Sequence, residues 1–143
     1  MDERYPIGVT ESCAVAVLRH DGGGGDAYGS WSATIGLRSG EATIHLPGHY
    51  AGVLAERLAG AAERFAPGRR LARDEYLDVT ALATDGAETL ALSSTARSPV
   101  RVTVEVSRDE VDELVSLLAE AQRLIETLRQ GLGLVPDSLP EAL

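Results

Sequence analysis

Residues 102–131 read VTVEVSRDEVDELVSLLAEAQRLIETLRQG, and this stretch decides the fold. Its first five residues alternate between valine and a polar residue, which predicts a β-strand with one apolar face. Beyond Ser107, apolar residues recur at helical spacing, namely Val111, Leu114, Val115, Leu118, Ala121, Ile125 and Leu128. We therefore expect a strand at about 100–106, followed directly by an amphipathic helix at about 108–130.

Ser107 and Glu110 have the spacing of a capping box. In such a box the serine hydroxyl accepts a hydrogen bond from the backbone N–H of the glutamate. The glutamate carboxylate in turn accepts one from the N–H of the serine. We expect this pair to start the helix and Gly131 to end it.

The chain also carries an internal repeat. Residues 42–46 and the apolar helical positions after them superpose without gaps on residues 102–106 and theirs, at an offset of 60 residues. Upstream, residues 15–22 align with residues 79–86 at an offset of 64, and both segments end in the turn dipeptide Asp-Gly. The repeat predicts two copies of a strand-strand-strand-helix unit.

The predicted elements follow from these two copies. They are strands at about 12–19, 29–38 and 41–46 with a helix at 49–65, then strands at about 76–84, 88–95 and 100–106 with the helix at 108–130. The fold class is α+β, an internally duplicated βββα-βββα arrangement of antiparallel sheets packed with two helices. We expect a single domain over 1–143, made of repeat 1 at about 12–65, a linker at 66–75, repeat 2 at about 76–130 and an extended C-terminal tail at 131–143.

This layout resembles the whirly-type fold, which includes single-strand nucleic-acid binders and actinobacterial sporulation proteins of the SsgA-like group. The resemblance covers most of the chain and concerns the order of its elements. It implies two sheets packed with two helices. It also makes a nucleic-acid or transcription-associated role one alternative for the function.

Charge argues against that alternative, because the formal net charge is −9 and binders of the phosphate backbone gain affinity from Lys and Arg. All 13 basic residues are arginine, which is typical of a GC-rich, actinobacterial-like bacterial genome. No apolar run approaches the roughly 20 residues of a membrane span. The first residues lack the pattern of a secretory signal, so we expect a cytoplasmic protein without membrane contact.

Residues that could carry chemistry do not form a catalytic or metal-binding pattern. His45 and His49 are separated by Pro47-Gly48, and a third metal ligand would have to come from Glu41, His20 or Asp21. The single Cys13 excludes an intramolecular disulfide, and we expect it buried or half-buried at a strand start. No nucleophile elbow surrounds Ser93 or Ser94, and the Gly22–Gly25 run favours a hairpin loop over a phosphate cradle. We expect no cofactor, and the sequence favours a protein that is not an enzyme.

Three groups of residues are candidates for interaction. The acidic helix face carries Asp109, Asp112, Glu113 and Glu120, and the basic patch, expected in a solvated loop, carries Arg69, Arg70 and Arg73. The apolar tail, with Leu134 and Leu139, would pack on a neighbouring subunit or on its own domain. Trp31 is expected in the core or at an interface.

The leading hypothesis is a non-catalytic protein-interaction, accessory or regulatory module that presents an acidic surface to a protein partner. The sequence does not identify this partner, and exposed sheet edges make a homodimer a further expectation. One alternative is the whirly-like nucleic-acid role, which requires a local basic groove. The other is a small-molecule binder or minor enzyme that uses a concavity between sheet and helices with His20, His45 or His49.

Overall fold

The computed structural model describes residues 3–19, 33–95 and 102–131. Several predicted features therefore lie outside the described residues, namely His20, Trp31, the Gly22–Gly25 run and the tail with Leu134 and Leu139. Within the described residues, neither helix is long and apolar enough to cross a membrane.

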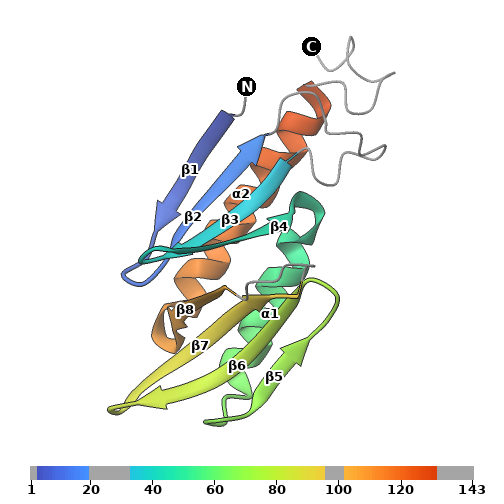
Figure 1. The fold of residues 1–143 in the computed structure, drawn as a ribbon. Helices are drawn as coiled ribbons and strands as arrows, with labels where there is room; N and C mark the ends of the chain where they lie inside the picture. Colours follow the sequence, from blue (N-terminus) through green and yellow to red (C-terminus); the bar gives the residue numbers. More distant parts are fainter. Residues whose placement is uncertain (1–2, 20–32, 96–101, 132–143) are drawn as a thin grey trace.

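Two four-stranded antiparallel sheets and two helices make up the described chain (Figure 1). Sheet A consists, in spatial order, of β1 (Glu3–Val9), β2 (Ala14–Arg19), β3 (Ala33–Ser39) and β4 (Ala42–Pro47). Sheet B consists of β5 (Arg70–Arg73), β6 (Leu77–Thr84), β7 (Ala87–Ser94) and β8 (Thr103–Ser107). Each sheet leads into a 3-10 turn and a helix, namely η2 (Gly48–Tyr50) with α1 (Ala51–Glu63) and η3 (Arg108–Glu110) with α2 (Val111–Gly131). The predicted α+β class and its duplicated layout are confirmed.

Burial follows the repeat that the sequence predicts. Residues at equivalent positions are buried in both copies, as in the pairs Leu54 and Leu114, Leu58 and Leu118, Ala61 and Ala121, Ile44 and Val104, and Leu46 and Val106. Between the last two pairs, His45 and Glu105 are both exposed. The offset of 60 residues therefore matches inward-facing with inward-facing positions in both strand and helix.

Each unit has one strand more than the sequence predicts. Residues 70–73, which were expected in the linker, form β5 and pair antiparallel with β6. Residues 3–9 form β1 and pair with β2, with a register shift between Pro6 and Gly8. Neither segment alternates cleanly between apolar and polar residues, so each becomes a strand through pairing with its neighbour rather than through its own pattern.

Each helix packs on the sheet of the other unit. Helix α2, which follows sheet B, contacts β1 and β2 of sheet A, whereas α1, which follows sheet A, contacts β5 of sheet B. Figure 1 shows α2 behind sheet A and α1 behind sheet B. The two helices also pack against each other, and buried residues of both sheets and both helices form one apolar cluster. Neither unit therefore completes its core with its own residues.

At the start of α2 a residue of the first unit also contacts the second unit, and the predicted capping box is wrong. Ser107 is the N-cap residue, but its side chain makes no capping hydrogen bond. Instead its N–H donates to the hydroxyl of Ser12, 3.1 Å away. The carboxylate of Glu110 accepts from both the N–H and the hydroxyl of Ser12, each at 2.9 Å. A serine from the first unit thus stands between the two members of the expected box.

Gly48 lies in close contact with β3 and with helix α2. A Cβ atom at this position would lie 2.7 Å from the carbonyl oxygen of Ala33 and 3.3 Å from Cγ2 of Ile125. The backbone oxygen cannot move aside as a flexible side chain can. A side chain at residue 48 would therefore push β3 away from the turn that begins α1.

We predict that Gly48→Ala lowers the free energy of unfolding by about 1–3 kcal/mol, the usual cost of overpacking. Urea denaturation would measure the change. Gly52→Ala is the matched control, because the nearest atom to its Cβ would be Nε2 at the end of the exposed Gln122 side chain, 3.3 Å away. Alanine inside helix α1 should stabilise the protein by up to about 1 kcal/mol. Equal stability of Gly48→Ala and the wild type would contradict the close approach.

Candidate functional site

The predicted basic patch does not lie in a loop. Arg70 and Arg73 belong to the edge strand β5, and Arg69 precedes it in a turn. Arg70 donates from Nε to Oδ1 of Asp78 at 3.1 Å, and Asp78 is only 2% exposed. Since a buried carboxylate needs a partner, Arg70 has a structural role. Arg69 and Arg73 remain exposed on the surface.

The residues considered for chemistry are dispersed. His45 lies on the outer face of sheet A, whereas the His49 ring packs edge-on to Tyr76, with centroids 5.8 Å apart. Cys13 is buried as expected, and burial raises the pKa of its thiol to about 11. The hydroxyls of Ser93 and Thr103 are 3.0 Å apart and hydrogen-bonded. No group of three or more His, Cys, Asp or Glu residues suited to a metal ion occurs among the described residues.

Two of the predicted acidic residues meet in a groove between the end of α1 and the start of α2. Asp109 and Asp112 line it together with Glu63, which the sequence analysis did not single out. The groove has a volume of about 490 Å³, and its remaining lining consists of Ala59, Ala62, Arg108 and Val111. Glu113 and Glu120 are also exposed on α2, but they do not line this groove. We refer to it as the acidic groove.

The arginine beside the acidic groove is already engaged. Arg108 donates from Nε to the carbonyl oxygen of Ala62 and from Nη1 to Glu88, each at 2.8 Å. Its guanidinium also lies over the ring of Phe65, 4.9 Å from the centroid. Arg108 therefore ties α2 to α1 and β7. In contrast, Glu63, Asp109 and Asp112 have no hydrogen-bond or ion-pair partner within the described residues.

A second hollow lies on the outer face of sheet A, on the side away from the core. It has a volume of about 180 Å³, and we call it the sheet pocket. All four strands contribute to its lining, which consists of Arg4, Ala14, Ala16, Leu18, Gly36, Arg38, Thr43 and His45. The space between sheets and helices, by comparison, is filled by the apolar core. The small-molecule alternative placed its concavity there, whereas His45 lines a pocket on the opposite side of the sheet.

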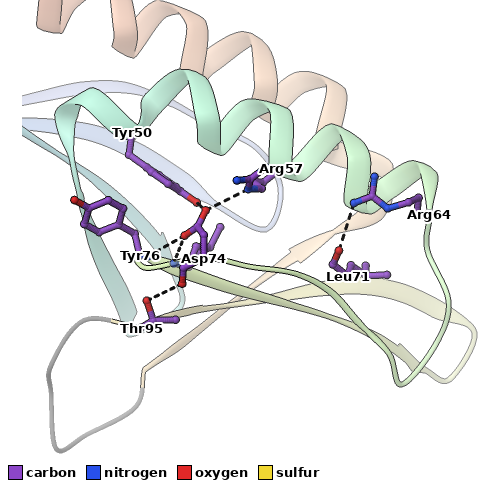
Figure 2. Close-up of polar contacts among 8 residues, drawn as sticks. Tyr50, Arg57, Arg64, Leu71, Asp74, Tyr76 and Thr95 are labelled. Carbon is purple, nitrogen blue, oxygen red and sulfur yellow. Dashed lines mark hydrogen bonds and ion pairs between the residues drawn. The ribbon is translucent and has the colours of Figure 1, made fainter.

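The carboxylate of Asp74 joins the two units through several hydrogen bonds (Figure 2). Asp74, in the turn before β6, accepts the hydroxyl of Tyr50 at 2.5 Å and Nε of Arg57 at 3.2 Å on its Oδ2 atom. Its Oδ1 atom accepts the N–H groups of Tyr76 and Leu77. Asp74 thus shapes its own turn while it holds the start of α1.

These contacts shift the ionisation of the groups involved. Burial opposes ionisation of Asp74, but hydrogen bonds from Tyr50, Tyr76 and Arg57 hold the pKa of its carboxyl below the usual value. Burial, followed by the hydrogen bond to Asp74, raises the pKa of the Tyr50 hydroxyl. Tyr50 is itself buried, so this cluster is a structural connection between the units.

Comparisons of the chain with protein-family models, with curated proteins and with solved structures found no match. Within residues 3–19, 33–95 and 102–131, the candidate sites are the acidic groove between the helices and the sheet pocket with its basic residues.

We predict that Asp74 makes stability depend on pH in the acid range. Because its pKa is lower in the folded than in the unfolded state, its contribution is present above about pH 4 and is lost as the pH falls through the folded-state pKa. Asp74→Asn should cost about 2–3 kcal/mol at neutral pH, since it removes charged hydrogen bonds. The difference from the wild type should shrink in acid, as measured by urea denaturation between pH 7 and pH 3.

Asp85→Asn is the control for this experiment. Asp85 is an exposed carboxylate in the turn between β6 and β7, and asparagine tolerates its positive φ of 51°. We expect a change within about 0.5 kcal/mol at every pH. A pH profile of Asp74→Asn that runs parallel to the wild-type profile would contradict the role given to Asp74.

Proposed function

We propose that the protein is a non-catalytic interaction module that binds a basic segment of a protein partner in the acidic groove. The observation that carries the proposal is the gathering of Glu63, Asp109 and Asp112 around one hollow, three carboxylates without a hydrogen-bond or ion-pair partner in the described part of the chain. Like charges that share a small surface repel one another. A cationic partner would relieve this repulsion.

The helix dipole accounts for only part of the acidic groove. Asp109 and Asp112 lie at the start of η3 and α2, where a negative charge complements the positive end of the helix. Glu63 is the last residue of α1, where the dipole disfavours a carboxylate. Since Glu63 is placed against the dipole and has no ion-pair partner among the described residues, its position supports a role outside the fold.

The outer edges of the two sheets are poorly suited to pairing with a strand of the partner. This favours a partner that contacts side chains instead. β4 and β8 contact each other, so β1 and β5 form the outer edges of the two sheets. β1 carries Pro6 and a register shift, whereas β5 has only four residues and an arginine at each end. Proline, irregularity and charge all hinder edge-to-edge pairing. The proposed partner therefore binds through the helical layer.

A photo-crosslinking experiment tests the proposal. In Ala59→Cys, a photoreactive maleimide would be attached at the acidic groove, because the native Cys13 is buried and its thiol has a raised pKa. We predict a crosslink to one protein with a basic segment, which weakens when salt rises from about 0.05 M to about 0.3 M. The same label in Thr127→Cys, exposed on α2 and about 22 Å along the helix from Asp112, should give no such product.

Charge-neutralising variants make this experiment specific. The triple variant Glu63→Gln, Asp109→Asn, Asp112→Asn should lose the crosslink. The control triple variant Glu41→Gln, Asp85→Asn, Glu126→Gln changes the net charge equally at exposed positions outside the groove and should keep it. If the two triple variants crosslink equally well, the acidic groove is not the binding site.

A further inference from the structure

The sheet pocket shares no lining residue with the acidic groove and lies on the outer face of sheet A. Side chains alternate along a strand, so the residues that do not enter the core share the outer face of sheet A. On β2 the core takes Val15 and Val17, which leaves Ala14, Ala16 and Leu18 on the outer face. The hollow therefore results from small residues in the middle of a sheet.

The floor of the sheet pocket is open because two neighbouring strands both carry small residues there. Ala16 of β2 is paired with Gly36 of β3. A Cβ atom on Gly36 would lie 3.1 Å from Cδ1 of Leu18 and 3.6 Å from Nδ1 of His45. The side chains of Leu18 and His45 thus lie close to Gly36 and narrow the sheet pocket there. The apolar lining of the pocket comes from Ala14, Ala16 and Leu18, which suit a short apolar body.

Positive charge lies at two opposite corners of the sheet pocket. Arg4 of β1 is paired with Leu18 of β2, and Arg38 of β3 is paired with Ala14 of β2. Ala14 and Leu18 are four residues apart, which is about 13 Å along the strand. Neither guanidinium has a hydrogen-bond or ion-pair partner within the described residues. Arg19, by comparison, donates to Glu3 at 2.7 Å. Both corners can therefore receive an anion.

The two corners differ in their neighbours. Thr43 is paired with Arg38, and His45 is paired with Gly36, so one end of the sheet pocket combines a guanidinium, a hydroxyl and an imidazole. The other end offers Arg4 beside Leu18. Arg side chains bind carboxylate and phosphate oxygens through paired N–H groups. This arrangement suits a ligand with an oxyanion at each end and a short apolar middle.

We propose that the sheet pocket binds a small organic dianion, whose oxyanions contact Arg4 at one end and Arg38, Thr43 and His45 at the other. The volume of about 180 Å³ is below the roughly 300 Å³ of pockets for drug-sized ligands, so the ligand is small. The net charge of −9 does not oppose this binding, because charges farther away than about 8 Å are largely screened at physiological salt.

Titration calorimetry and backbone-amide NMR of the full chain test the proposal. The probes with an anionic group at each end are the dicarboxylates succinate and glutarate, and 3-phosphoglycerate, which has a carboxylate at one end and a phosphate at the other. Butyrate and inorganic phosphate are the ligands that lack the second anionic end. We expect saturable binding of at least one dianion, with amide shifts confined to sheet A. The preferred dianion identifies the oxyanion as carboxylate or phosphate. Binding of butyrate or inorganic phosphate as tight as that of every dianion would overturn the proposal, and so would binding of none of the probes.

Three variants locate the binding. Arg38→Gln and Arg4→Gln should each weaken binding of the dianion by about tenfold or more, whereas Arg123→Gln, an equal charge change on exposed α2, should leave it unchanged. Ala16→Leu should abolish binding by filling the floor without any change in charge. An amide spectrum that retains the wild-type dispersion shows that each variant is folded. If Arg123→Gln weakens binding of the dianion as much as Arg38→Gln does, the change in net charge explains the effect and the proposal is overturned.

A single-stranded oligonucleotide is the last probe, because two arginines could also contact a phosphate backbone. If it binds in an Arg38-dependent manner while no small dianion does, the pocket belongs to a nucleic-acid surface and the proposal fails. None of these readouts depends on the acidic groove. Loss of the crosslink described above and loss of dianion binding are therefore separate results.

Discussion

The packing of each helix on the sheet of the other unit is the constraint on which the rest of the structure depends. Because α2 contacts β1 and β2 while α1 contacts β5, an isolated unit would expose the inner face of its sheet and the apolar face of its helix. Burial of apolar side chains is the main favourable contribution to folding. The two units therefore stabilise each other, and a separated half of the chain would lack the residues that close its core.

Polar contacts concentrate where the units cross. Ser12 of the first unit links Ser107 and Glu110 at the start of α2, and Asp74 of the second unit holds Tyr50 at the start of α1. These hydrogen bonds are directional, whereas apolar burial is not. We infer that they set the position of each helix along the foreign sheet, while the shared core supplies most of the stabilisation. The contact between Ser12 and Glu110 lies at the start of α2, next to Asp109 of the acidic groove.

The outer faces of the two sheets have diverged although the layout is shared. His45 and Glu105 occupy equivalent exposed positions, so the fourth strand of each sheet presents a different chemical group. On sheet A the outer face is hollow and carries Arg4 and Arg38. On sheet B the corresponding region carries the buried Asp78, paired with Arg70, and the hydrogen-bonded Ser93 and Thr103. The core positions of the duplicated scaffold stay apolar, which leaves the outward positions free to change without loss of the fold.

The sequence by itself determined the elements that have their own hydrophobic period. Alternation in residues 102–106, helical spacing after Val111 and the offset of 60 residues were enough to predict six strands, two helices and the duplicated layout. They also placed Asp109 and Asp112 together on an acidic surface. Only the tertiary structure decided which helix covers which sheet and that β1 and β5 are strands. It also decided that Glu63 lines the acidic groove with Asp109, and that Arg4 lines the sheet pocket with Arg38. The physical reason is that a local pattern shows which face of an element is apolar, whereas its partner is selected by contacts between residues far apart in the chain. Ser12 and Glu110, 98 positions apart, form such a contact in place of the local capping box.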